Sequence, residues 1–168
     1  MSKAILISIK PKYVAKILNG EKTIEIRKTM PKCELPIEVY IYCSKESGLL
    51  KLGNNPYFVK GKVVAKFTLN KCQEWHNYSW QEITSNGCVS DDELKKYANG
   101  RESLYIWHID NLEIFEKPIE LKEFYKYGVS EWIHNADKDM GYNQFWNCVE
   151  DFRLVKAPQS WCYVEELE

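Results

Sequence analysis

Three charged side chains of unlike chemistry lie within six consecutive residues of this chain, at Lys22, Glu25 and Arg27. An arginine can hold a phosphate through two parallel hydrogen bonds, and a lysine supplies a compact positive charge. A carboxylate can accept a hydrogen bond from a base amino group. A stretch that only had to pack would not need all three so close together. Residues 20–27 therefore predict the floor of a polar cleft that holds part of a nucleic acid.

The flanking elements must position these side chains. Residues 4–9 are rich in β-branched residues and predict a buried strand. Apolar residues then recur at helical spacing from about 11 to 19, and Gly20 stands where a left-handed helix cap belongs. From residue 22 the period of the apolar residues changes to two. Glu25 and Arg27 are therefore expected on the face opposite Ile24 and Ile26.

Each charged residue has more than one interpretation. Lys22 can contact phosphate, can act as a general base if its pKa is lowered, or can be an exposed lysine after a turn. Glu25 and Arg27 can bind a ligand or form a surface ion pair of little energy. The further binding candidates lie at element ends or carry aromatic rings that could stack on bases, with solvated ends and core packing as the alternatives. They are Lys10, Tyr42, Ser44, Lys45, Trp161 and Tyr163.

The rest of the chain predicts one α+β domain over residues 1–168. Alternating apolar residues indicate strands over 37–43, 61–69 and 103–115, and a short final strand is expected within 157–164. Helical insertions are predicted around 73–100 and 120–152. With about five or six strands and flanking helices, the pattern favours a mixed β-barrel.

Composition narrows the functional class. No apolar run approaches the roughly 20 residues of a membrane-spanning helix, and no signal peptide is seen. The six cysteines form no CxxC pair and the histidines have no metal-ligand spacing, so we expect a cytoplasmic protein with reduced thiols and neither metal nor cofactor. Residues 1–71 hold 14 Lys/Arg and 5 Asp/Glu, which can present a phosphate-attracting face or neutralise the acidic second half.

The pattern G-x-K-x-x-E-x-R, carried here by Gly20, Lys22, Glu25 and Arg27, resembles the signature of the ASCH domain family, which is similar to the PUA domains of RNA-modifying enzymes. Three flanking stretches fit its longer bacterial and phage-type members in the same order. They are residues 6–11, 39–44 and 158–163. The resemblance implies a PUA-like fold, with Gly20 as a structural turn residue and the motif lining an RNA-binding cleft.

The resemblance also implies the ligand class and its alternatives. RNA or a nucleotide is the expected partner, with DNA as an alternative and no membrane.

Some small family members are enzymes that cleave single-stranded RNA or hydrolyse N4-acetylcytidine, and in these Lys22 and Glu25 would be the catalytic positions. The amidohydrolase type carries a threonine at the place of Glu25, so its nucleophile is missing here. A protein-interaction module is the third alternative. If RNA binds, charge reversal at Arg27 should weaken binding without unfolding the protein.

Overall fold

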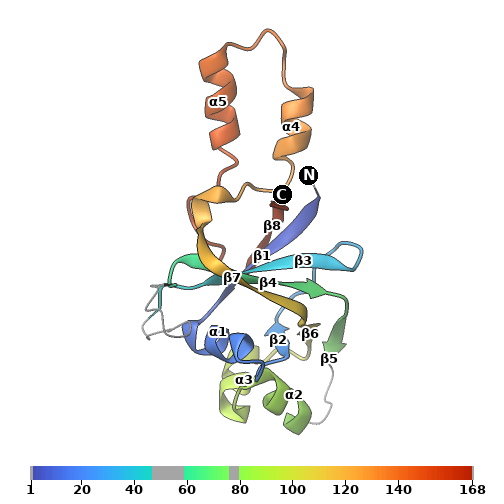
Figure 1. Ribbon diagram of the computed structural model, residues 1–168. Coiled ribbons are helices and arrows are strands. Elements are labelled where there is room, and N and C mark those ends of the chain that lie inside the picture. The colour runs from blue at the N-terminus through green and yellow to red at the C-terminus, as the bar shows by residue number, and fades with distance from the viewer. Residues whose placement is uncertain (1, 47–58, 76–79, 168) are drawn as a thin grey trace.

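The computed structural model describes residues 2–46, 59–75 and 80–167, without the side chains of residues 80 and 82. Its elements form a two-sheet body from which a pair of helices projects (Figure 1). The strands are β1 (Lys3–Ile9), β2 (Ile24–Arg27), β3 (Ile37–Cys43), β4 (Lys62–Leu69), β5 (Cys72–Trp75), β6 (Leu104–His108), β7 (Asp110–Glu120) and β8 (Trp161–Glu165). The helices are α1 (Pro11–Leu18), α2 (Trp80–Gly87), α3 (Asp91–Ala98), the 3₁₀ turn η1 (Leu121–Glu123), α4 (Val129–Asn135) and α5 (Tyr142–Glu150).

The larger sheet has five strands in the order β7-β4-β3-β1-β8. β1 and β3 are parallel, and α1 and β2 lie between them in the chain, as a parallel connection requires. β8 then pairs antiparallel with β1, with Ile7 opposite Trp161. The last strand of the chain is therefore placed beside the first one, at the end from which α1 departs.

The smaller sheet has the order β2-β6-β5, with both pairs antiparallel. The α+β class is confirmed, whereas the predicted barrel is not, because the pairings among the described residues give two separate sheets. Residues 103–115 were also expected to form one strand, and that prediction was wrong. β6 is the central strand of the small sheet, and β7 is an edge strand of the large one. The chain changes sheets at Ile109, two residues before Asn111 with its positive φ of 49°.

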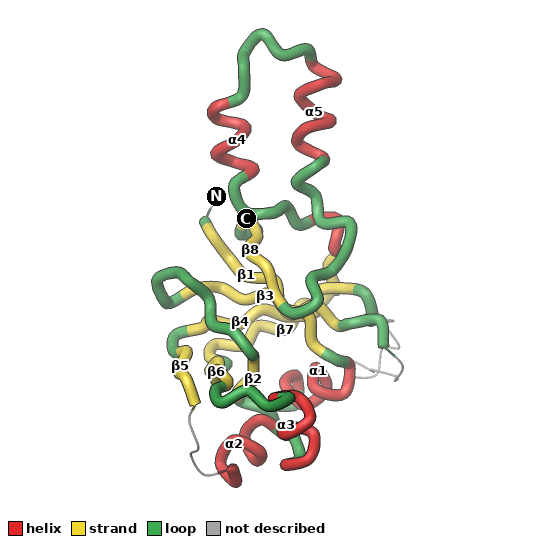
Figure 2. The backbone as a smooth tube through the Cα atoms, turned by 180° about the vertical axis from the view of Figure 1, so that it is seen from behind, coloured by secondary structure: helices red, strands yellow, loops and turns green. Residues whose placement is uncertain are grey.

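The helices fall into two groups. α1, α2 and α3 surround the small sheet at one end of the body, and α4 and α5 form a hairpin that projects from the other end (Figures 1 and 2). The carboxylate of Glu165 accepts hydrogen bonds from Gly128 N at 3.0 Å and Ser130 N at 3.2 Å, and so caps the start of α4. Among the described residues no helix has the length and apolarity needed to cross a membrane.

Three buried clusters hold these layers together. One lies between the large sheet and α1 and includes the fully buried Trp107. A second covers the opposite face of the large sheet, around Tyr40 and Phe124. The third packs the small sheet against the α2–α3 segment, where Ile26 and Leu94 are buried. The motif strand β2 consequently lies between the third cluster on one face and α1 on the other.

Candidate functional site

A cleft of about 500 Å³ lies where α1, β2 and α3 meet the ends of β1 and β3. Four separate segments of the chain supply its walls, together with Gln159 just before β8. The lining residues are Ser8, Ile9, Lys10, Lys12, Tyr13, Lys22, Glu25, Ile26, Arg27, Ser44, Glu46, Val89, Glu93, Leu94, Lys96, Tyr97 and Gln159.

Local structure directs the motif toward this cleft. Gly20 has a φ of +75°, and the amides of Gly20, Glu21 and Lys22 donate back to carbonyls of the last turn of α1. The chain then enters β2, where Ile24 and Ile26 pack in the cluster under α2 and α3. Because side chains alternate along a strand, Glu25 and Arg27 project to the α1 side.

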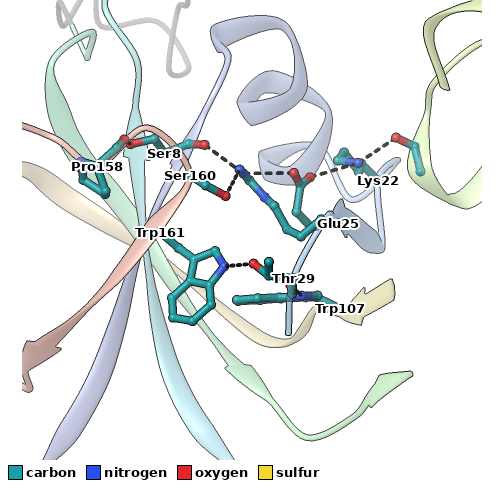
Figure 3. Close-up of polar contacts among 10 residues, drawn as sticks. Ser8, Lys22, Glu25, Thr29, Trp107, Pro158, Ser160 and Trp161 are labelled. Carbon is teal, nitrogen blue, oxygen red and sulfur yellow. Dashed lines mark hydrogen bonds and ion pairs between the residues drawn. The ribbon is translucent and has the colours of Figure 1, made fainter. Parts of the chain in front are cut away.

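Lys22, Glu25 and Arg27 form a charged row across the floor of the cleft (Figure 3). Lys22 Nζ lies 3.1 Å from Glu25 Oε2, and Arg27 Nη2 lies 3.0 Å from Glu25 Oε1. Lys22 Nζ also donates to the carbonyl oxygen of Gly87 at 2.7 Å. One carboxylate is thus shared by two cations, and the row carries one net positive charge.

All three side chains of the row are buried. The relative exposures are 2% for Lys22 and 7% for both Glu25 and Arg27. Removing one partner of a buried ion pair is strongly destabilising, because it leaves an uncompensated charge away from water. The expectation that Arg27 can be reversed without affecting the fold therefore conflicts with this geometry, since a glutamate at position 27 would stand beside Glu25.

Arg27 also joins the row to the large sheet. Its Nη2 donates to the carbonyl oxygen of Ser8 at 2.7 Å, and its Nη1 donates to Ser160 Oγ at 3.3 Å. The Ser8 hydroxyl in turn donates to the carbonyl oxygen of Pro158 at 2.7 Å (Figure 3). The end of β1 and the segment before β8 are thereby fixed against the motif strand.

Three buried polar atoms of the cleft residues have no hydrogen-bond partner within the described ranges. They are Nε of Arg27, Oε2 of Glu25 and the hydroxyl oxygen of Ser44. Glu25 Oε2 has only its ion-pair contact with Lys22, without hydrogen-bond geometry. Buried polar groups normally have partners, so these three atoms, all shielded from solvent, mark where the cleft walls are incompletely hydrogen-bonded.

Surface ion pairs cross the mouth of the cleft. Lys10 Nζ lies 3.3 Å from Glu46 Oε2, and Lys12 on α1 pairs with Glu93 on α3. Contact with Lys12, followed by the backbone N–H of Ser90, lowers the pKa of Glu93 to about 2. All four charged side chains of these pairs are about half exposed, so a ligand can displace the pairs at little cost.

The cleft gathers five of the nine residues that sequence analysis proposed for nucleic-acid binding, namely Lys10, Lys22, Glu25, Arg27 and Ser44. The other four lie outside its lining. Tyr42 is buried in the cluster on the opposite face of the large sheet, and the exposed side chain of Lys45 lies against Gly61. Trp161 and Tyr163 are partly buried along β8, where Trp161 Nε1 donates to Thr29 Oγ1 at 3.0 Å.

Sequence reasoning missed the wall contributed by α3 and the aromatic pair Tyr13 and Tyr97. No local pattern links residues 89–97 to the motif, because the link is the long-range contact between Lys22 and Gly87. Gln159 and Ser160 could have been predicted from the sequence, since they lie in one of the stretches that carried the family resemblance. Within the described ranges, no three His, Cys, Asp or Glu side chains gather as a metal site would require.

Comparisons with known proteins agree with this architecture. A family model described as the ASCH domain matches residues 7–119. The crystal structure of ASCH from Zymomonas mobilis aligns with a TM-score of 0.57 at 18% identity, covering 87% of this chain and 93% of that one. A tyrosine-to-phenylalanine mutant of the same bacterial protein aligns with a TM-score of 0.58 at 18% identity, over 88% and 97% of the two chains. A search of curated protein sequences found no match. The chain belongs to the ASCH domain family.

Proposed function

We propose that this ASCH domain binds RNA and holds one nucleotide in the cleft above the charged row. The cleft volume of about 500 Å³ falls within the range of small-molecule sites and suits a group of nucleotide size. Its walls combine the side chains that such a ligand needs. Tyr13 and Tyr97 supply aromatic rings, the charged row supplies polar groups, and Lys10 and Lys96 supply positive charge near the mouth.

The observation that carries this proposal is the buried charged row at the floor of a cleft that opens to the outside. Five lining residues are cationic and three are anionic, so the cleft has an excess of positive charge. An anionic backbone is attracted to such a surface, while the side chains of Arg27 and Ser44 line the same cleft beside the bound base or sugar. Glu25 holds Arg27 in place through its Oε1 contact.

The test uses charge reversal at the mouth, where the fold is not at risk. Lys10 and Lys96 are both exposed, so a Lys10→Glu/Lys96→Glu variant should fold normally. Its affinity for a labelled 12-nucleotide random-sequence RNA should fall about tenfold or more, across all sequences. The slope of log affinity against log salt should also decrease by about 1.4, since each lost contact with a single strand contributes about 0.7.

A matched control separates local contacts from net charge. Lys117→Glu/Lys138→Glu makes the same charge change at two exposed lysines, on β7 and between α4 and α5. This variant should bind RNA within about twofold of the wild type. Equal affinity of the cleft variant, the control and the wild type would show that the cleft does not bind RNA.

The enzyme hypothesis is tested on the same samples. Lys22 already donates to Gly87 and pairs with Glu25, so the geometry favours a binding role over a proton-transfer role. Labelled RNA and N4-acetylcytidine incubated with the wild type should remain intact by gel and chromatography. A product formed by the wild type and lost in a Lys22→Met variant that circular dichroism shows to be folded would establish catalysis instead. The protein-interaction alternative loses its main support, because a cleft does lie beside Lys22.

A further inference from the structure

A row of aromatic rings and lysines leaves the cleft and continues along β8. Tyr97, which lines the cleft, has Lys28 Nζ 4.9 Å from its ring centroid. The next residue, Thr29, accepts two hydrogen bonds: its hydroxyl oxygen accepts from Trp161 Nε1 at 3.0 Å, and its carbonyl oxygen accepts from Trp107 Nε1 at 3.3 Å. The charged row is joined to the residue before Trp161, because Arg27 Nη1 donates to Ser160 Oγ at 3.3 Å, and Figure 3 draws both sets of contacts.

The row then passes from Trp161 to the base of the helical hairpin. The rings of Trp161 and Tyr163 meet edge to face with centroids 5.3 Å apart. Lys3 Nζ lies 4.8 Å from the Tyr163 centroid and 4.3 Å from that of Tyr127. The backbone N–H of Lys32 donates to the Tyr163 hydroxyl at 2.7 Å, which brings a third lysine to the row.

These six residues, Lys3, Lys28, Lys32, Tyr127, Trp161 and Tyr163, form what we call the β8 track. None of its three lysines has a carboxylate within ion-pair distance among the residues that the structure describes. Its rings are only partly buried, and Tyr127 is 44% exposed. Aromatic rings that alternate with lysines lacking a carboxylate partner in the described ranges match single-stranded nucleic acid, whose bases stack while its phosphates need positive charge.

We propose that the β8 track binds the nucleotides that flank the one held in the cleft, so that the domain recognises a single-stranded RNA segment. This inference rests on the proposed function of the cleft and extends it from one nucleotide to several. The excess of cations favours RNA over a protein partner. The track also gives Trp161 and Tyr163, which lie outside the cleft, a place in the same binding surface.

The experiment compares a short and a long RNA. Uridine oligomers of 2 and 12 nucleotides are titrated into the wild type, with NMR shifts for the short one and fluorescence anisotropy for the long one. The track variant is Lys3→Ala/Lys32→Ala/Tyr127→Ala. The control is Lys117→Ala/Lys138→Ala/Tyr142→Ala, which removes the same residue types from exposed positions away from the track. A thermal melt of each variant verifies folding.

The wild type should bind the 12-mer more tightly than the dinucleotide. The track variant should weaken 12-mer binding about tenfold or more, because a stacking ring and two phosphate contacts are lost, and should leave dinucleotide binding within about twofold. The control should change neither affinity.

Each other outcome has a defined meaning. Equal affinity of the two lengths for the wild type, or unchanged 12-mer binding by the track variant, would overturn the track. If Lys10→Glu/Lys96→Glu still weakens both lengths in that case, the cleft proposal stands and only the track fails. If neither set of variants alters RNA binding, the cleft proposal fails as well.

Discussion

The buried charged row makes a quantitative prediction about stability. In Glu25→Gln the side chain keeps its shape and loses its charge, so Lys22 and Arg27 remain buried without a counter-ion. Their ion-pair distances of 3.1 and 3.0 Å are both to this carboxylate. Breaking a buried pair of this kind typically costs about 3–5 kcal/mol. We therefore expect the free energy of unfolding to fall by about that amount.

The measurement is urea denaturation followed by circular dichroism, with thermal melts as a second readout. For a chain of this size each kcal/mol corresponds to about 2–4 °C, so the Tm should fall by about 6–20 °C. Glu46→Gln is the matched control. It makes the same substitution in an ion pair of the same cleft, but its partner Lys10 and Glu46 itself are more than half exposed. We expect at most about 1 kcal/mol for this control.

The two variants together test whether the buried charged row is needed for stability. If Glu25→Gln unfolds within about 1 kcal/mol of the wild type while Glu46→Gln behaves similarly, the row is not the structural centre that its burial indicates. A second consequence can be measured on the same protein. Because the variant cleft holds two uncompensated cations, inorganic phosphate should raise the Tm of Glu25→Gln more than that of the wild type.

Three further predictions use other features of the chain. Gly20→Ala places a methyl group in open space but at a φ of +75°, so urea denaturation should show a loss of about 1–2 kcal/mol from backbone strain alone. Burial raises the pKa of the Cys43 and Cys72 thiols to about 11, so mass spectrometry should find both alkylated far more slowly at pH 8 in the native protein than in urea. Because the pKa of Glu93 is lowered from 4.5 to about 2, the stability of its contact with Lys12 is present above pH 4.5 and lost as the pH falls through about 2. This loss of stability should be below about 1 kcal/mol, because the pair is so exposed. Thermal melts of Glu93→Gln between pH 2 and 5 should lack this pH-dependent loss.

Local patterns predicted the parts of the fold that depend on neighbours in sequence. The helix before Gly20, the change of period at residue 22 and the alternation in 37–43 all follow from side-chain spacing, and the structure places elements there. The sheet change at Ile109 could not be read in this way. Residues 103–115 remain apolar on both sides of the break, so the periodicity continues although the chain passes from one sheet to the other.

The candidate site was predictable only in part, for a related reason. The motif lies in one segment, and the charged row therefore followed from spacing and strand geometry. Its burial did not, because it depends on α1, on α3 and on Ser160, which is 133 residues from Arg27 in sequence. Aromatic residues show the same limit. Tyr42 and Trp161 looked equivalent in sequence, yet Tyr42 is buried in the second cluster, whereas Trp161 is only partly buried, packs against the first cluster and donates to Thr29.

The contact between Lys22 and Gly87 also joins the motif segment to the end of α2. Lys22 donates to a backbone carbonyl oxygen, and every residue has such an acceptor. This hydrogen bond therefore does not depend on which side chains the two adjoining helices carry. Position 87 itself is restricted, because a Cβ there would lie 3.0 Å from the end of the Ile26 side chain. The position of one small residue is thus restricted, while the outward-facing residues of the helices on either side can change without loss of this contact.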